Sequence, residues 1–556
     1  MQSQTPFVKA AFGLLILFAG HSVRAAAPPT GGQLLQEVPV PTPPSAPARP
    51  MVTVVRPDAS VAAPGEAFLV TQIDITGNTE LPRQAIQDLV ASSQGKTLSL
   101  ADLQRLAEKI TALYEKHGYP FSQAYVPAQT MREGHVQIAV LEARYDNVVL
   151  HNTGRVSDLV AQVPLAELKI GAPVAQATLD RVLLLESDLP GTDVKGTLRP
   201  GKTAGASELF VEIEPGPRVR TSVSADDYGN AATGRARLDA NVSFSNPLHA
   251  GDVLSMNALS SGNGMTYGRV GYQVPVYGPA TQIEAHVSAL GYRIVNGSEA
   301  ALEAHGVANV YGLTLQNILL RQTDVNVTAQ LTYDETLLRD HIDVSGLRTD
   351  RHTQDWRASI AGSVNDAGGS NNFSAGLTSG KVVFDDPTAR LVDGSGAHTG
   401  GQFVKFTVSV SRLQRISATT ALFGSLSYQA ADGNLDSSEQ LFTGGPYSVR
   451  AYDNGIVSGS QGDSLSLELR QDLWSNSSNR WQGTVFVDNA HVQIEKNAYS
   501  AGINNATLSG FGVGLNWINA QGWSLTSALS RPMGGSPVIA GHRDSLRVWM
   551  KVEKDF

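Results

Sequence analysis

The stretch that decides the fold lies in the second half of the chain and alternates between apolar and polar residues: Val404-Lys405-Phe406-Thr407-Val408-Ser409-Val410-Ser411. Successive side chains of a β-strand point to opposite faces, so this period of two predicts a strand with one apolar face. The last residues of the chain show the same pattern, with Val548, Met550 and Val552 on one face, and the chain ends at Phe556. From residue 217 onward, short runs of this kind are separated by Gly, Asn, Asp and Ser, and the helical period is lost.

Two folds alternate in this way, a soluble β-sandwich and a membrane β-barrel. The pattern continues over roughly 340 residues, which is too long for one sandwich and fits about 16 strands at roughly 21 residues each. No later stretch is long and apolar enough for a transmembrane helix, so a chain that enters a membrane must do so as a closed barrel. We therefore predict a transmembrane antiparallel β-barrel over residues 217–556, with Phe556 as an interfacial aromatic at its C-terminus.

The composition excludes several other functions. The chain has 556 residues with 54 Gly and only 17% charged residues, which is typical of β structure with many turns. A formal net charge of −9 argues against nucleic acid as a partner, because phosphate binding needs a basic surface. Cysteine is absent, and the 12 His residues have no ligand spacing, so we expect no metal site, no cofactor and no disulfide framework.

The first 66 residues predict export followed by a linker. Lys9 precedes an apolar run from Ala10 to Gly20, and Val23-Arg24-Ala25 offers a small-residue cleavage site. This pattern predicts a signal peptide over residues 1–25, because the apolar run is about half the length of a membrane anchor. Residues 26–66 are rich in Pro and Ala and predict an extended segment, with a short amphipathic patch at Gln33-Leu34-Leu35-Gln36.

Between the linker and the barrel, the pattern predicts two α+β units, over residues 67–142 and 143–216. In the first unit a helix follows Pro82, and a second begins at Ser99 with Asp102 as its capping-box partner. The second unit repeats the order of strand, helix, helix, strand and strand, and its clearest helix runs over residues 173–189. Two consecutive units of about 75 residues predict a tandem of small domains.

The most specific motif of the chain is Leu441-Phe442-Thr443-Gly444-Gly445-Pro446-Tyr447-Ser448-Val449-Arg450-Ala451-Tyr452. Further segments are Asp227-Tyr228-Gly229-Asn230, Asn246-Pro247-Leu248 and Gly462-Asp463. Together they resemble the transporters of two-partner secretion, the haemolysin secretion/activation family within the outer-membrane assembly superfamily. The resemblance spans nearly all of the mature chain. Ala451 stands where the family's most common motif has Gly, so we expect no positive φ at this position.

The resemblance implies a fold and a candidate site. The tandem units correspond to the family's POTRA domains, and the motif corresponds to a loop that folds back into the pore, with Val449, Arg450, Ala451 and Tyr452 as gating residues. The family holds its loop Arg on an Asp of the barrel wall, which implies that Arg450 binds Asp488 beside Phe486. Alternation puts Phe486 and Asp488 on one face, which is the lumen if the neighbouring valines meet lipid. From spacing alone, two unrelated solvated charges are the alternative.

The resemblance also implies the function. The chain would capture an unfolded exoprotein in the periplasm, through an edge strand of a POTRA domain, and secrete it through the barrel without nucleotide hydrolysis. The client would be an adhesin, a cytolysin or a contact-dependent toxin, and the other partner would be outer-membrane lipid. We expect a monomeric barrel in the cell outer membrane with the POTRA domains in the periplasm. In this family a helix before these domains can plug the pore, and the patch around Leu34 is its candidate.

Three other classes of protein fit the sequence less well. An enzyme is not expected, because the chain has no Gly-x-Ser-x-Gly and no His-Glu-x-x-His motif. Gly510-Phe511-Gly512-Val513-Gly514 superficially resembles a dinucleotide loop, but it predicts a strand with small residues facing the lumen. A passive porin would need no tandem periplasmic domains. The alternative function is an outer-membrane protein assembly factor (an insertase) of the same superfamily, although such factors usually carry more periplasmic units.

Overall fold

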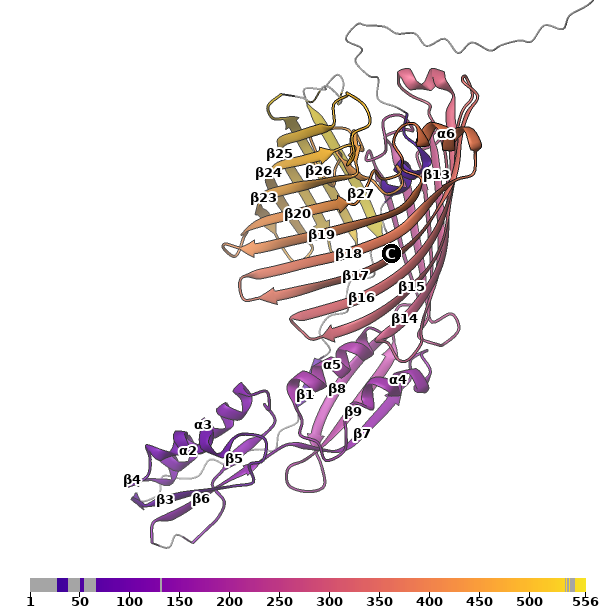
Figure 1. Cartoon of the computed structure of the whole chain (residues 1–556). Helices are drawn as coiled ribbons and strands as arrows, with labels where there is room; N and C mark the ends of the chain where they lie inside the picture. The colour runs from indigo at the N-terminus through magenta and orange to yellow at the C-terminus, as the bar shows by residue number, and fades with distance from the viewer. Residues whose placement is uncertain are drawn as a thin grey trace, which may run out of the picture.

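The computed structural model describes residues 28–38, 51–54, 67–130, 133–535, 537, 540 and 546–556. Figure 1 shows two small α+β domains below a large β-barrel. The predicted signal peptide, 1–25, and most of the predicted linker, 26–66, lie outside the described residues. Among the described helices, none has the length and the apolar character needed to cross a membrane.

The first domain contains β2 (Phe68–Val70), β3 (Gln72–Thr76), α2 (Arg83–Ala91), β4 (Lys96–Leu98), α3 (Leu100–Lys116), β5 (Gln123–Tyr125) and β6 (His135–Leu141). Its main sheet has the order β3-β6-β5, with β3 parallel and β5 antiparallel to β6. The capping box predicted for α3 is confirmed, because Ser99 Oγ accepts from the Asp102 N–H at 3.2 Å and Asp102 accepts from the Ser99 N–H at 2.8 Å. The strands β2 and β4 form a separate pair.

The second domain contains β7 (Arg144–Asn152), α4 (Asp158–Leu165), α5 (Gln176–Ser187), β8 (Thr192–Pro200) and β9 (Ala206–Pro215). The predicted order of strand, helix, helix, strand and strand is confirmed. The sheet gains a fourth strand that the sequence did not predict, β1 (Met51–Val54), which pairs in parallel with β8 from within the Pro-rich segment. Sequence alone cannot show this pairing, because its partners are more than 100 residues apart.

Glu142 holds the two small domains together at their junction. Its carboxylate accepts from the backbone N–H groups of Thr79 and Glu80 at 2.6 and 2.8 Å, from the Tyr114 hydroxyl at 2.9 Å, and from Arg144 at 3.0 Å. Burial by itself would raise the pKa of Glu142, but the hydrogen bonds outweigh burial and lower the pKa to about 2. The carboxylate is therefore charged at neutral and mildly acidic pH.

The barrel consists of 16 strands, and the predicted fold class is confirmed. The strands are β10 (Val219–Asp226), β11 (Arg237–Ser245), β12 (Val253–Ser260), β13 (Met265–Pro275), β14 (Thr281–Arg293), β15 (Ala304–Arg321), β16 (Val325–Ile342), β17 (Leu347–Asp366), β18 (Gly369–Phe384), β19 (Gly401–Arg415), β20 (Thr420–Ala431), β23 (Gln461–Ser475), β24 (Asn479–Gln493), β25 (Asn505–Asn519), β26 (Trp523–Pro532) and β27 (Arg547–Asp555). Neighbouring strands are antiparallel, and β10 pairs with β27 to close the barrel, so no sheet edge remains open. Two short helices, η1 (Ser298–Leu302) and α6 (Pro387–Gly394), lie in the connections.

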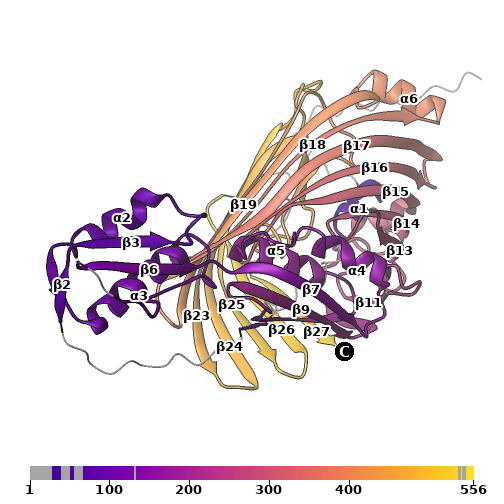
Figure 2. The same cartoon turned by 90° about the horizontal axis from the view of Figure 1, so that it is seen from below.

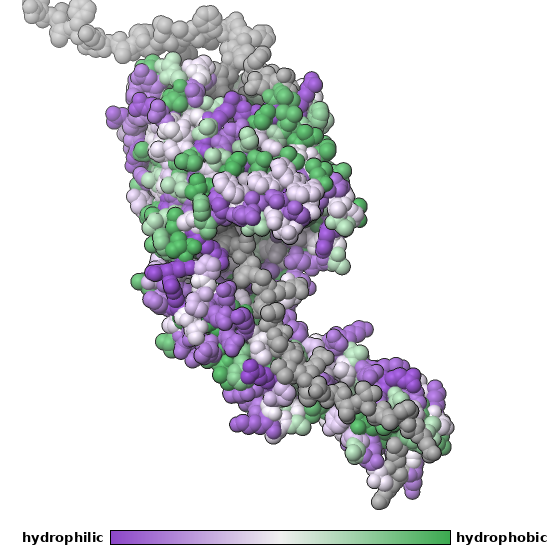
Figure 3. Space-filling view, turned by 180° about the vertical axis from the view of Figure 1, so that it is seen from behind, coloured by the Kyte–Doolittle hydropathy of each residue, from purple (hydrophilic) through white to green (hydrophobic). Residues whose placement is uncertain are grey.

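The wall of the barrel follows the predicted alternation. In β19 the side chains of Val404, Phe406 and Val410 are exposed on the outer surface, whereas Lys405 is buried. Figure 3 shows apolar residues spread over the outer wall. Exposed apolar side chains in such number fit a surface that meets lipid rather than water.

The second domain is attached to the barrel by α5 and its C-terminal end. Asp188 binds Arg321, at the end of β15, with both carboxylate oxygens at 2.7 and 2.8 Å. Next to this ion pair, Glu186 has no exposed surface, and neither of its carboxylate oxygens has a hydrogen-bond partner among the described residues. Burial raises the pKa of Glu186 to about 9.

Candidate functional site in the barrel lumen

The connection between β20 and β23 folds back into the barrel and carries the predicted gating motif. It contains the short hairpin β21 (Leu441–Thr443) and β22 (Val457–Gly459). At its tip, Val449, Ala451 and Tyr452 are buried in a cluster with apolar residues of β24 and β25, among them Val492 and Leu508. This cluster packs the tip of the loop against the wall.

Arg450 and Asp488 are in direct contact. The guanidinium donates from Nε and Nη2 to the two oxygens of Asp488 at 2.8 and 2.7 Å, and the backbone N–H of Arg450 donates to the same carboxylate at 3.1 Å. Phe486 lies beside the pair, with its ring centroid 3.4 Å from the guanidinium carbon. The structure thus brings together the three residues that were predicted to meet, and the Asp488 side chain has no exposed surface.

The charges around this contact are balanced. Arg450 also donates to Glu468 of β23 at 2.7 Å, and the second oxygen of Glu468 accepts from Arg470 at 2.6 Å. Two arginines therefore face two carboxylates, which reduces the cost of removing these charges from water. Ser466 contributes a hydroxyl to both Arg450 and Asp488, at 3.0 and 2.8 Å. Glu468, Ser466 and Arg470 were not predicted, although alternation along β23 places all three on the lumen face.

The backbone of the tip is held from the opposite side. The carbonyl oxygen of Arg450 accepts from the Trp549 indole N–H of β27 at 2.7 Å and from the Ser530 hydroxyl of β26 at 2.6 Å. Ala451 is not among the residues with positive φ, as expected. The strands β23, β24, β26 and β27 thus all contact one residue of the loop.

Small residues in β25 make room for the tip. A Cβ atom on Gly510 would collide with the Cβ of Ala451, and one on Gly512 would lie 2.6 Å from Cζ of Phe486. The prediction that the glycine-rich run is a strand with small lumen-facing residues is confirmed. The absence of side chains at these glycines leaves room for Ala451 of the loop and for the Phe486 ring.

The base of the loop has a second ion-pair anchor, which sequence reasoning missed. Arg351 of β17 donates to Asp436 of the loop and to Asp340 of β16, both at 2.7 Å, and to the Ser437 hydroxyl at 2.9 Å. Arg351, Asp340 and Asp436 are all buried. No spacing rule connects Asp436 with an arginine 85 residues earlier.

A helix of the N-terminal segment, α1 (Gly31–Gln36), also lies in the lumen. It begins with a capping box at Thr30, and Leu34 packs in a buried cluster with Leu259, Leu290 and Leu338 of the wall. The backbone N–H of Gly31 donates to Asp340 at 2.8 Å. The amphipathic patch around Leu34 therefore forms a helix that contacts β14, β15 and β16.

Glu37, at the C-terminal end of α1, connects this helix to both the wall and the loop. One carboxylate oxygen accepts from Asn230, in the β10–β11 connection, at 2.8 Å, and the other accepts from Asn454 of the loop at 3.1 Å. The Gln36 side chain donates to the backbone oxygen of Ser438, also in the loop. The helix and the loop thus lie side by side in the lumen.

The predicted C-terminal residue, Phe556, follows the end of β27. Its backbone N–H donates to the Thr221 carbonyl of β10 at 2.9 Å, and its ring is largely exposed. The ring lies 4.8 Å from Nζ of Lys554. This exposed position at the seam between the first and last strands fits the predicted interfacial aromatic.

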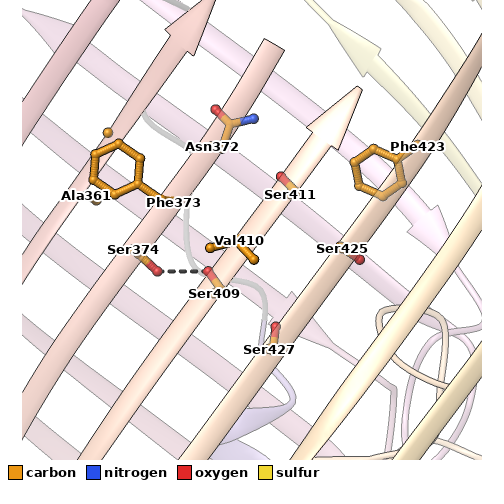
Figure 4. Close-up of a pocket in the computed structure, with 11 residues that line it drawn as sticks. Ala361, Asn372, Phe373, Ser374, Ser409, Val410, Ser411, Phe423, Ser425 and Ser427 are labelled. Carbon is orange, nitrogen blue, oxygen red and sulfur yellow. Dashed lines mark hydrogen bonds between the residues drawn. The ribbon is translucent and has the colours of Figure 1, made fainter. Parts of the chain in front are cut away.

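The wall formed by β17 to β20 is open and rich in hydroxyl groups. A depression of about 470 Å³ is lined there by residues without charge, and Ser374 and Ser409 share a hydrogen bond of 2.8 Å across neighbouring strands (Figure 4). In the pairing register, Asn372, Ser411, Ser425 and Ser466 follow one another across four strands and lead to Asp488. The row of small polar residues therefore ends at the loop anchor.

Comparison with known proteins identifies the family. The profile described as "Haemolysin secretion/activation protein ShlB/FhaC/HecB" matches residues 205–517, which is more than half of the chain. The chain belongs to this family. A second profile, "POTRA domain, ShlB-type", matches residues 68–143 of the transporter. The predicted family is thus confirmed, and it consists of transporters rather than enzymes.

Individual relatives agree with this assignment. The transporter is 24% identical over 500 residues to the heme/hemopexin transporter protein HuxB of Haemophilus influenzae, with 88% of each chain covered. It is 24% identical over 455 residues to the outer membrane transporter CdiB of Escherichia coli, covering 78% of this chain and 74% of the relative. The solved structure of CdiB from Escherichia coli has a TM-score of 0.69 at 21% identity, with 90% of this chain and 93% of that chain covered.

A more distant structure shares the barrel type. BamA from Haemophilus ducreyi, lacking POTRA domains 1–3, has a TM-score of 0.52 at 14% identity and covers 88% of this chain and 100% of that chain. At this identity the likeness shows a shared fold, whereas the family profile and the named relatives are those of secretion transporters. The protein is therefore an outer-membrane transporter of two-partner secretion, with its POTRA domains in the periplasm.

Proposed function

We propose that this transporter passes one unfolded exoprotein through its barrel, and that α1 together with the inward loop closes the pore between transport events. The observation that carries the closure is the contact of Arg450 with Asp488, because it attaches the loop to the wall at its tip. The domain boundaries that we propose are 26–66 for the plug and linker segment, 67–142 and 143–216 for the POTRA domains, and 217–556 for the barrel.

Capture of the client falls to the first POTRA domain in this proposal. An extended chain can add to a sheet edge through main-chain hydrogen bonds, which requires no particular client sequence. In the second domain β1 already pairs with β8, and β7 forms the other edge next to β9. In the first domain β5 is an edge strand next to β6, and its Tyr125 is exposed. We therefore assign the first contact with the client to β5.

The hydroxyl-rich wall offers a path through the barrel. The residues that line the depression are uncharged and mostly small, so an unfolded chain of any charge can slide along it with weak hydrogen bonds. Export needs no nucleotide in this scheme. Folding of the client outside the cell removes it from the equilibrium and gives the transport its direction.

The partners in this proposal are one secreted exoprotein and the lipid of the outer membrane. The relatives' names include a heme/hemopexin transporter and a hemolysin transporter, so an adhesin, a cytolysin or a contact-dependent toxin fits this chain equally. The exposed apolar wall fits outer-membrane lipid, and the closed barrel, without an open sheet edge, fits a monomer.

Deletion of the coding sequence tests the proposal. We expect surface release of one large exoprotein to stop, while the abundance of other outer-membrane barrels, measured by quantitative proteomics, stays unchanged. Complementation with the intact chain is the control and should restore release. A general loss of outer-membrane barrels on deletion would contradict secretion and support the assembly function instead.

A further inference from the structure

Four large apolar side chains are exposed where the second POTRA domain meets the periplasmic rim of the barrel. Leu159 of α4 is 81% exposed and Leu248, in the β11–β12 turn, is 71% exposed. Val276 and Tyr277, in the β13–β14 turn, are 58% and 77% exposed. Side chains of this size are costly in water, and several of them at one place mark a surface that has a partner.

The helix α4 sits directly on these two turns. The backbone N–H of Ser157, the residue before α4, donates to the His249 carbonyl of the β11–β12 turn at 3.0 Å. In the β13–β14 turn, Gly278 has no room for a side chain, because a Cβ there would lie 2.6 Å from Cγ1 of Val163 of α4. Figures 1 and 2 show α4 at the lower end of the barrel, on the side of β13 and β14. Leu159 is thus held at the periplasmic rim of the barrel.

This rim continues the surface that meets lipid. Met256 of β12, Val270 of β13 and Val287 of β14 are exposed on the outer wall of the same strands whose turns carry α4. The turns lie at the periplasmic ends of these strands, where the inner leaflet ends. Tyr277 has the amphipathic ring that is enriched at membrane interfaces, and Arg155, four residues before Leu159, is exposed for contact with anionic headgroups.

We propose that α4 and the two periplasmic turns bind the phospholipid surface of the inner leaflet of the outer membrane. The contact would use Leu159, Leu248, Val276 and Tyr277 as one apolar patch. It would fix the second POTRA domain against the membrane plane in addition to the ion pair of Asp188 with Arg321. The patch is independent of client capture and of loop closure, so it holds whether or not those proposals do.

The absence of cysteine from the chain allows a direct test. Leu159→Cys and Tyr277→Cys, each labelled with an environment-sensitive fluorophore, are reconstituted into phospholipid nanodiscs that hold one barrel each. The matched control is Ile170→Cys. Ile170 is an apolar residue of the same domain that is also exposed, but it adjoins Gly171, whose carbonyl accepts from Arg144 at the junction with the first domain.

We expect spin-labelled phospholipid in the disc to quench the fluorophores at positions 159 and 277 at least three-fold more strongly than the fluorophore at 170. Equal quenching at 159 and 170 would overturn the proposal. The same samples distinguish lipid from two other partners of the patch. A change in the environment of the fluorophore at position 159 only in discs with two barrels would indicate a second copy of this chain. A change only after addition of the exoprotein would indicate the client, and either result would overturn lipid binding.

Discussion

Replacement of Arg450 by alanine should release the loop tip from the barrel wall. The guanidinium makes four hydrogen bonds with three side chains, and Asp488, its main partner, is completely buried. Removal of one partner of a buried ion pair typically costs about 3–5 kcal/mol, because the other charge stays buried without compensation. In Arg450→Ala, the backbone N–H at position 450 and the Ser466 hydroxyl still donate to Asp488.

These two remaining hydrogen bonds place the expected cost at the lower end of this range, about 3 kcal/mol. A free-energy change of this size corresponds to a factor on the order of 100 in the ratio of attached to released loop. Arg450→Lys keeps the charge but loses the bidentate geometry, so we expect a smaller change, about ten-fold. The assay is planar-bilayer conductance of the purified protein, with the fraction of time in the high-conductance state as the readout.

The control for this experiment is Arg480→Ala. Arg480 lies on β24, the same strand as Asp488, and pairs with Asp472 at 2.9 Å without touching the loop. The double variant Arg450→Ala/Asp488→Ala should open little more often than either single variant, because both changes break one contact. Additive effects in the double variant, or equal traces for Arg450→Ala and Arg480→Ala, would refute an anchoring role for the contact.

Three further predictions concern the plug, the wall and the second POTRA domain. Glu37→Ala removes the acceptor that α1 offers to Asn454 and should raise the open fraction about ten-fold in the same assay; an unchanged open fraction would show that α1 is held without it. Gly512→Ala should destabilise the barrel by about 2 kcal/mol in thermal unfolding, because the added methyl group meets the Phe486 ring, and it should cost clearly more than Gly514→Ala, whose site has more room. Glu186 has a pKa raised to about 9 from an ordinary value of 4.5, so its domain should lose stability as the pH rises through this window, and Glu186→Gln should remove that loss in melting experiments at pH 5 and pH 8.

The strands of the barrel were predictable because lipid and lumen impose opposite polarity on alternate residues. In β19 the apolar residues face outward and Lys405 faces inward, as the period of two in residues 404–411 predicts. The helix caps were predictable for a similar reason, since Ser99 and Asp102 satisfy each other within four residues of chain. Sequence patterns predict structure where the environment alternates regularly along the chain, or where the interacting residues are close in sequence.

Contacts between distant segments were not predictable from these rules. Arg351 and Asp436 lie in two separate polar stretches of the sequence. Only closure of the barrel brings Nε of Arg351 to 2.7 Å from the Asp436 carboxylate. Glu186 belongs to a helix in which a glutamate predicts a solvent-facing position, whereas the structure buries it together with most of the surrounding residues of α5. The Arg450 contact was anticipated only through the family resemblance, since spacing alone favours two unrelated charges.

Asp340 links the helix α1 to the base of the inward loop. One of its carboxylate oxygens accepts from the Gly31 N–H of α1 at 2.8 Å and from the Tyr292 hydroxyl at 2.7 Å, and the other accepts from Arg351, which holds the base of the loop. If α1 leaves, Asp340 keeps both Tyr292 and Arg351, so the base of the loop loses none of its ion pairs. The tip of the loop is held separately at Asp488, on a different wall. Withdrawal of α1 breaks the hydrogen bonds of Gln36 and Glu37 to the loop but none of the ion pairs that hold the loop. We expect Asp340→Ala, unlike any change at Arg450, to weaken the attachment of α1 and of the loop base at once.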